Sequence, residues 1–409
     1  ALPAGGGKVY LMEGTYDISG SINVPDNTTL TGSGTSTIIT IPNGQNGSYD
    51  MITNSDTTTG TNVTIENLLL DGNKANQTSG DMSAISFYGV GSSTLPGGRL
   101  DGLIVKNIAD HTAVYDGSIN IFGHGNSVTN NTFENNGDDG VSLYTGGNNV
   151  ITGNVFINNI GSGIYDSAVG DTVSDNTLEG NNSGTLDYPT GAINLDQPTG
   201  DTVTGNTITG NTGDGINSWD SGENNNISGN SVQNNTGSGI NSTDYYDNIS
   251  NNTVENNSVY GISIVNGGNS TVSGNNIDSN GGLTTNEGIY LQYGTQNSIT
   301  DNNITDSSCT TTCYAIDISD TYSTGNTLSG NNFIGDGTHN ATIHDATSSG
   351  TIYNAQQLTQ NGDAEFRNGT NSTSAFQIQN AAGGTILAAA TTATQVSISA
   401  SPNLVQISA

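Results

Sequence analysis

One six-residue pattern recurs along most of this 409-residue chain: an apolar residue, Thr or Ser, any residue, Asn, any residue and a second apolar residue. It is clear in "VTNNTF" (128–133), "ITGNVF" (151–156) and "VTGNTI" (203–208). The shared asparagines are Asn131, Asn154, Asn176, Asn206, Asn230, Asn252, Asn275, Asn302 and Asn331. Most of the intervals between them are 22–24 residues, and three grow to 30, 27 and 29. A period this short indicates stacked repeats, each of which contacts only its neighbours.

A second pattern follows each of the first eight copies, for example "GVSL" at 140, "GIYD" at 163 and "GINS" at 215. Apolar and polar residues alternate within these runs, which is the periodicity of a strand and not of a helix. Short strands separated by Gly and Asn turns fit a coil of about 22–24 residues that stacks on the next coil at the ~4.8 Å strand spacing. The sequence therefore predicts a parallel β-helix.

The recurring asparagine has a structural explanation in such a fold. Asn tolerates the left-handed backbone conformation of a turn, and its amide both donates and accepts hydrogen bonds. Stacked asparagines can therefore bond along the helix axis and satisfy buried turn backbone. We also expect the glycine that opens the second pattern to supply a positive φ at the next corner.

Charge narrows the range of partners. Only 10% of the residues are charged, against about 25% in a typical domain. Five Lys and Arg stand against 37 Asp and Glu, for a net charge of −32, and neither Lys nor Arg occurs between Lys106 and Arg367. Nucleic acid and anionic membrane surfaces are excluded as partners, because both need clustered basic residues. No stretch approaches the ~20 apolar residues of a membrane span, so we expect no membrane insertion.

The two cysteines lie close together in "SSCTTTCYA", as Cys309 and Cys313. No second Cys or His pair lies nearby to complete a zinc site. We expect a short-loop disulfide formed in an oxidising compartment, with free thiols as the alternative. Together with the low basic content, this spacing predicts a protein that is secreted or displayed on a cell or virion surface.

The N-terminal segment "AGGGKVYLMEGTYDISGSI" (4–22) is similar to the opening of right-handed β-helices of the pectate-lyase-like superfamily, and the coils resemble the repeats of that superfamily. The resemblance covers roughly residues 4–345 and implies a right-handed, single-stranded parallel β-helix, which we assign to residues 1–349. Residues 350–409 lack the Asn column but contain short strand-like runs. This segment resembles C-terminal modules of bacterial surface and fibre proteins, so we expect a small β-rich assembly or capping segment.

The resemblance also supplies catalytic patterns against which the chain can be compared. Polygalacturonase-like hydrolases combine Asp-Asp, then Gly-His-Gly, then Arg-x-Lys; here "GHG" (123–125) precedes "GDDGVSL" (137–143), and no Arg-x-Lys occurs. Pectate lyases of the superfamily use a basic residue that the central coils lack, and the Asp-Pro-His signature of alginate epimerases is missing. An acidic surface would also repel polyuronates. All three chemistries are disfavoured.

With uronate polymers disfavoured, a neutral polysaccharide is the glycan that we expect this chain to contact. Stacking the second pattern places Tyr165, Asn194 and Asn217 in one outward column, with Tyr144, Asp196 and Trp219 two residues further along their strands. The sugar-binding residues predicted from this arrangement are Tyr144, Tyr165, Tyr188, Trp219 and Tyr245. A glycoside hydrolase needs two carboxylates, and the candidates are Asp166, Asp196 and Asp220.

Two other groups of polar residues are expected to be structural. Asp138 and Asp139 fall in the turn before the second pattern, and we expect a solvated corner there. His339 and His344 have no metal-ligand spacing, so we expect solvated turn residues. We predict no metal site and no cofactor, with Ca²⁺ at acidic surface positions as the alternative.

Two hypotheses for function follow. The first is a structural or adhesive β-helix, a subunit of a surface layer, filament or fibre that self-associates through its ends or its C-terminal segment and contacts glycans. The second is a tailspike-like glycoside hydrolase that acts on a neutral polysaccharide through paired aspartates. The uniform repeat and the missing catalytic signatures favour the first.

Overall fold

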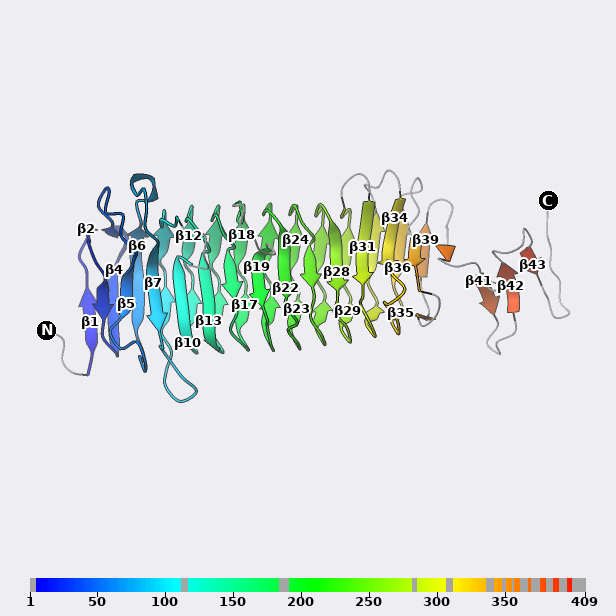
Figure 1. Ribbon diagram of the computed structural model, residues 1–409, viewed down its shortest axis with the longest axis horizontal. Helices are drawn as coiled ribbons and strands as arrows, with labels where there is room; N and C mark the ends of the chain where they lie inside the picture. Colours follow the sequence, from blue (N-terminus) through cyan, green and yellow to red (C-terminus); the bar gives the residue numbers. More distant parts are fainter. Residues whose placement is uncertain are drawn as a thin grey trace.

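The computed structural model describes residues 5–111, 117–183, 191–281, 285–306, 312–335, 342–347, 351–354, 357–360, 367–368, 376–379, 385–389 and 396–398. Apart from one short 3-10 turn at Lys74–Asn76, all the regular structure in these residues is β. Figure 1 shows a single long stack of strands running from the N-terminal coils to the C-terminal ones.

Each central coil supplies two three-residue strands to a 26-stranded sheet, sheet A, and one strand to a 14-stranded sheet, sheet B. The strands of sheet A are β1 (Gly7–Tyr10), β2 (Gly14–Asp17), β4 (Thr28–Thr40), β6 (Thr64–Asp71), β8 (Arg99–Asp101), β9 (Ile104–Lys106), β11 (Ser127–Thr129), β12 (Thr132–Glu134), β14 (Val150–Thr152), β15 (Val155–Ile157), β17 (Thr172–Ser174), β18 (Thr177–Glu179), β20 (Thr202–Thr204), β21 (Thr207–Thr209), β23 (Asn226–Ser228), β24 (Ser231–Gln233), β26 (Asn248–Ser250), β27 (Thr253–Glu255), β29 (Thr271–Ser273), β30 (Asn276–Asp278), β32 (Ser298–Thr300), β33 (Asn303–Asp306), β35 (Thr327–Ser329), β36 (Asn332–Gly335), β38 (Ile352–Asn354) and β39 (Gln357–Gln360).

Sheet B forms the other side of the coil. Its strands are β3 (Ile22–Val24), β5 (Tyr49–Asn54), β7 (Met82–Tyr88), β10 (Ile119–His124), β13 (Val141–Gly147), β16 (Ile164–Asp166), β19 (Gly191–Asp196), β22 (Asp214–Trp219), β25 (Ile240–Ser242), β28 (Tyr260–Val265), β31 (Thr285–Gln292), β34 (Thr312–Ile318), β37 (Thr342–Asp345) and β40 (Arg367–Asn368). Strands pair in parallel from one coil to the next, as in β13–β16–β19. The predicted parallel β-helix is therefore present.

Parallel pairing continues beyond the predicted boundary at residue 349. Strands β38, β39 and β40 extend both sheets in the same register as the coils before them. The strands that follow, β41 (Phe376–Gln379), β42 (Thr385–Ala389) and β43 (Val396–Ile398), pair antiparallel in a small sheet of their own. The loss of the Asn column at residue 350 thus does not coincide with the end of parallel pairing.

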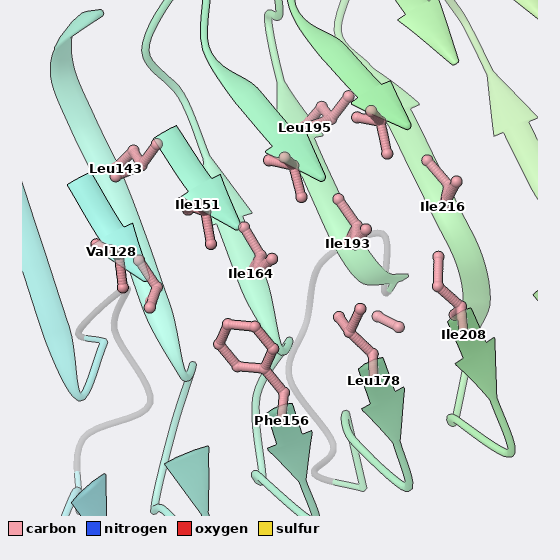
Figure 2. Close-up of a cluster of buried hydrophobic side chains, with 14 of the residues drawn as sticks. Val128, Leu143, Ile151, Phe156, Ile164, Leu178, Ile193, Leu195, Ile208 and Ile216 are labelled. Atoms are coloured by element: carbon pink, nitrogen blue, oxygen red, sulfur yellow. The ribbon is translucent and has the colours of Figure 1, made fainter. Parts of the chain in front are cut away.

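The core is a set of apolar columns that run along the axis. In most of the three-residue strands of sheet A only the middle side chain is buried, as with Val128, Phe156 and Leu178. Figure 2 shows these side chains meeting those of sheet B, including Ile164 and Ile193, inside the coil. Successive rungs bring identical groups together, and the rings of Phe133 and Phe156 stack at 4.8 Å. The interior is largely apolar, with single buried polar side chains such as Ser218, which pairs in register with Leu195.

The stability of such a core should fall measurably when a single methylene group is removed from it. Ile208 is fully buried, and its neighbours in the column are Leu178 and Val232. We expect Ile208→Val to lower the free energy of unfolding by about 0.5–1.5 kcal/mol. Urea unfolding followed by circular dichroism measures the change. The same substitution at Ile160, which is 37% exposed, should have almost no effect, and equal losses at both sites would contradict this description of the core.

The predicted asparagine ladder is present. The Oδ1 atom of Asn154 accepts hydrogen bonds from the backbone N–H (2.9 Å) and the Nδ2 atom (3.0 Å) of Asn131, one coil earlier. Its own Nδ2 atom donates to the carbonyl of Val128 at 2.8 Å and to Oδ1 of Asn176 at 3.0 Å. The left-handed conformation lies one residue earlier than expected, at positions such as Asn130 (φ 55).

Two further ladders flank the predicted one. One lies five residues later in each coil and contains Asn136, Asn159, Asn181, Asn211, Asn235, Asn257 and Asn280. The other lies five residues earlier and contains Asn126, Asn149, Asp171, Asp201, Asn225 and Asp247. The corners on both sides of sheet A are thus held by stacked polar side chains.

The glycine that opens the second pattern has a different role from the predicted one. Gly140, Gly163 and Gly215 have no positive φ. A Cβ atom at Gly140 would lie 2.5 Å from a ring carbon of Phe156, and one at Gly163 would lie 2.6 Å from Leu178. These glycines are required because the core side chains of sheet A press against the start of each sheet B strand.

Candidate functional site

Sheet B carries three of the five predicted sugar-binding residues, Tyr144, Tyr165 and Trp219. Tyr165 pairs in register with Asn194, and Asn194 with Asn217, so the predicted column exists, but its three side chains are buried, with exposed fractions of 6%, 5% and 0%. Asp196 pairs in register with Trp219, two residues further along their strands. Both of these side chains are half-buried.

Tyr165, Asp196 and Asp220 are linked by hydrogen bonds and charge. The Tyr165 hydroxyl donates to Oδ2 of Asp196 at 2.5 Å. Burial raises the pKa of Asp196, and the charge of Asp220 adds to that rise, while the Tyr165 hydrogen bond opposes it. Asp220 lies in the turn after β22, with φ 68, and its Oδ2 accepts from Nε2 of Gln197 at 2.8 Å. Two predicted carboxylates therefore lie beside an aromatic ring and within electrostatic reach of each other.

Asp166 does not belong to this surface. It pairs in register with the core residues Leu143 and Leu195, and none of its surface is exposed. Burial raises its pKa well above the usual range, and the charges of Asp171 and Asp201 add to that rise. A buried carboxyl group cannot reach a polysaccharide, so the prediction of Asp166 as a catalytic residue is wrong. The physical reason is the two-residue period of a strand: Tyr165 faces outward, so the next residue faces inward.

The aromatic surface is longer than the sequence indicated. The ring of Phe122 stacks on Tyr88 at 5.1 Å and on Tyr144 at 4.7 Å. Tyr144 in turn lies 6.0 Å from Tyr165 in a tilted arrangement. Tyr88 and Phe122 are absent from the sequence-based prediction, although "FYG" and "IFG" hold aromatic residues at the matching strand positions. We call Tyr88, Phe122, Tyr144, Tyr165, Asp196, Trp219 and Asp220 the aromatic–acid patch.

Other predicted residues lie elsewhere. Tyr245 is 38% exposed but lies in a separate column of bridges between Glu223 and Gly268, beyond the edge of sheet B. Tyr188 and Cys309 lie outside the described residues, as does the side chain of Cys313, so the predicted disulfide stays a prediction.

The Asp138–Asp139 corner is not solvated. The two residues are 5% and 6% exposed. Oδ1 of Asp139 accepts from the backbone N–H of Ser162 at 2.6 Å, and Oδ2 accepts from the Ser142 hydroxyl at 3.2 Å. Burial raises the pKa of Asp139 to about 7, and the charge of Asp110 contributes to the rise. The prediction of a solvated corner is wrong, because the neighbouring coil covers the turn.

Neither a metal cluster nor a membrane helix is found in the part of the chain that the structure describes. No group of three or more His, Cys, Asp or Glu side chains there has a metal-binding arrangement. Likewise, no helix among these residues is long and apolar enough to cross a membrane. Calcium at acidic surface positions stays a prediction.

Comparison with known proteins assigns the family. The sequence profile described as "Right handed beta helix region" matches residues 14–197, 117–277 and 191–370, so the chain belongs to this family of right-handed parallel β-helices. A search of curated protein sequences found no match.

Solved structures agree in fold. The chain is similar to a mutant of the periplasmic alginate epimerase AlgG, with TM-score 0.53 and 13% identity over 85% of this chain and 79% of that one. It is also similar to the Dettilon tailspike protein gp208, with TM-score 0.52 and 16% identity over 85% of this chain and 62% of that one. A third similar structure is ORF18 of Geobacillus virus E2, with TM-score 0.50 and 18% identity over 75% of this chain and 54% of that one. At these identities the likeness concerns the fold alone.

Proposed function

We propose that this chain is an adhesive β-helix protein, secreted or displayed on a cell or virion surface, that binds a neutral polysaccharide through the aromatic–acid patch. The observation that carries the proposal is the stacked column Tyr88–Phe122–Tyr144, which continues to Tyr165 and its bonded partner Asp196. Aromatic rings bind the apolar faces of sugars, and carboxylates accept hydrogen bonds from their hydroxyls.

Charge supports a neutral ligand. The strands that carry the patch, β7 to β22, contain no Lys or Arg on sheet B, whereas Asp196 and Asp220 lie within the patch. Carboxylates on both sides of an interface would repel each other, so uronate and sulfated polymers are poor candidates. Similarity of fold to a tailspike protein and to a polysaccharide epimerase is compatible with a glycan ligand.

The test is a binding measurement on immobilised polysaccharides, with neutral and uronate polymers compared at equal ionic strength. We expect the neutral polymers to bind and Trp219→Ala to weaken that binding by about tenfold to a hundredfold, because buried aromatic anchors dominate such contacts. Tyr10→Ala, which removes a 57% exposed tyrosine far along the helix, serves as the matched control. Equal binding by wild type and Trp219→Ala would refute the role of the patch.

Hydrolysis is the second candidate function. It is favoured by one observation, the raised pKa of Asp196 beside the charge of Asp220, which suits a general acid paired with a second carboxylate. New reducing ends that appear in the binding mixture with wild type, and are absent with Asp196→Asn, would convert the adhesive assignment into an enzymatic one.

Self-association is part of the same proposal. The small antiparallel sheet β41–β43 differs in pairing from the coils, and an open sheet edge is a template for another chain. We propose that residues 350–409 mediate assembly, and the mass of the particle in solution is the measurement that addresses it.

A further inference from the structure

A second group of aromatic and titratable side chains lies on the outer face of sheet B, in the C-terminal coils. It occupies two neighbouring outward columns, in which Tyr260, Glu287 and Tyr314 pair in register, as do Tyr290, Asp317 and His344. We call these six residues the tyrosine–acid cluster. None of them was predicted to contact a ligand.

The members of this cluster contact one another directly. The rings of Tyr260 and Tyr290 stack at 4.2 Å with an angle of 7° between their planes. Tyr314 stacks on the His344 ring at 4.8 Å. Nδ1 of His344 lies 2.6 Å from Oδ1 of Asp317, and Glu287 is hydrogen-bonded to the same aspartate. His344 was expected to be a solvated turn residue, and that prediction is wrong because it lies in β37 and is half-buried.

The fold itself does not require these residue types. In the preceding coils the same outward column holds small polar side chains that bond along the axis. Asn217 donates to Asn194 at 2.8 Å, Asn241 donates to Asn217 at 2.9 Å, and Ser263 donates to Asn241. A continuation with Asn or Ser would extend this row, whereas two partly buried carboxyl groups in contact destabilise the folded state whenever both are charged.

The protonation state of the cluster suits a hydroxyl-rich ligand. Burial raises the pKa of Glu287 to about 7, and the charge of Asp317 adds to this rise. Burial also raises the pKa of Asp317, an effect that His344 opposes. A protonated carboxyl group donates one hydrogen bond and accepts others, as sugar hydroxyls do. The stacked tyrosines supply the apolar platform beside it.

The cluster and the aromatic–acid patch are both carried by sheet B, whose strands follow one another along the axis in Figure 1. From Asp196 on β19 to Tyr290 on β31, the pairing passes through β22, β25 and β28. Four steps at the strand spacing of ~4.8 Å separate Asp196 from Tyr290 by ~19 Å along the axis. The nearest members of the two groups, Trp219 on β22 and Tyr260 on β28, are two steps or ~10 Å apart.

We propose that the tyrosine–acid cluster is a second glycan-contacting site, and that one extended neutral polysaccharide chain lies along sheet B and occupies both sites. The inference rests on the proposed function of the first patch and adds to it the extended form of the ligand. Binding at the second site is then intramolecular, so affinity rises steeply once a chain is long enough to span the gap.

The experiment measures the affinity of wild type and variants for a size series of one neutral oligosaccharide that the protein binds as a polymer. The series runs from members shorter than ~10 Å, which cannot touch both groups, to members well beyond ~19 Å. For wild type we expect a gain of at least about tenfold between the short and long members. Tyr290→Ala should leave the affinity for short members unchanged and abolish the gain, whereas Trp219→Ala should weaken binding of all members.

Two controls keep the test decisive. Glu287→Met keeps a side chain of similar length but removes the hydrogen-bonding oxygens, so it should reduce the gain even if Tyr290→Ala disturbs the fold, which thermal unfolding monitors. Tyr290→Phe should retain most of the gain, because it keeps the stacked ring. A wild type with no dependence on length, or folded Tyr290→Ala and Glu287→Met variants with the full gain, would overturn the second site. Absence of binding at every length would instead refute the proposed function itself.

Discussion

Replacing Asn154 with alanine is expected to lower the free energy of unfolding by about 3–6 kcal/mol, the largest single-site effect we expect in this chain. Asn154 is 1% exposed, and five hydrogen bonds of 3.2 Å or shorter reach its side chain. Alanine would leave the backbone N–H of Asn131 and the carbonyl of Val128 without these bonds in a dry interior, while Oδ1 of Asn176 would keep only the bond from the backbone N–H of residue 154. Each buried polar group left unsatisfied costs about 1–3 kcal/mol.

The measurement is equilibrium unfolding in urea, with Asn276→Ala as the matched control. Asn276 is an exposed asparagine of sheet A whose Oδ1 accepts one hydrogen bond, from Asn303 at 2.8 Å. Its loss should cost less than about 1 kcal/mol, as is usual for surface positions. Similar losses for both variants would show that the ladder adds nothing beyond an ordinary surface bond.

The same ladder shows what could be predicted from sequence. The spacing of Asn131, Asn154 and Asn176 was sufficient to predict the coil, because a buried corner recurs once per turn and only an amide satisfies it in both directions. The ladder through Asn136 and Asn159 was missed because "NN" runs offer several candidate rungs per coil, and spacing alone does not distinguish a buried amide from an exposed one.

The site was less predictable than the fold. Register placed Tyr165 and Asp196 correctly on the outer face of sheet B, since strand alternation follows from the pattern itself. Asp166 was misplaced because an inward-facing aspartate violates the rule that charged side chains avoid the core. The contacts of His344 were beyond prediction, because its partner Asp317 comes from the preceding coil and the pairing of β34 with β37 contains a register shift.

Buried acids lead to the second large effect: the protein is expected to be markedly more stable at pH 4 than at pH 8. Four carboxyl groups have pKa values raised to about 7, chiefly by burial: Asp139, Asp201, Asp247 and Glu287. The pKa of Asp214 is raised to about 6 for the same reason. Asp56, Asp101 and Asp320 have lowered pKa values and act in the opposite direction, but they are partly exposed to solvent, which screens their charges and weakens their effect.

The sign follows from proton linkage. A carboxyl group whose pKa is higher in the folded state holds its proton more tightly when the chain is folded. Its stabilising contribution to the free energy of unfolding is therefore fully present below the unfolded pKa near 4. That contribution is lost as the pH rises through the folded pKa near 7. Each unit by which the pKa is higher in the folded state than in the unfolded state corresponds to about 1.4 kcal/mol in the free energy of unfolding. Because several such groups act together, we expect a loss on the order of 5 kcal/mol between pH 4 and pH 8. Melting temperatures measured across this range should fall by about 5–10 °C, because the entropy of unfolding of a 409-residue chain is large.

Asp201→Asn isolates one of these groups. Asp201 occupies a ladder position that Asn225 fills one coil later, and its Oδ1 accepts from the backbone N–H of Asp171 at 2.7 Å. An amide keeps that acceptor and removes the charge, so the variant should be more stable than wild type by about 1–3 kcal/mol at pH 8 and nearly equal to it at pH 4. The exposed Asp301, changed to Asn in the same way, should alter neither value. A wild type that melts at the same temperature at both pH values, or an Asp201→Asn variant that is destabilised at pH 8, would contradict the assignment of these acids as protonated members of the folded coil.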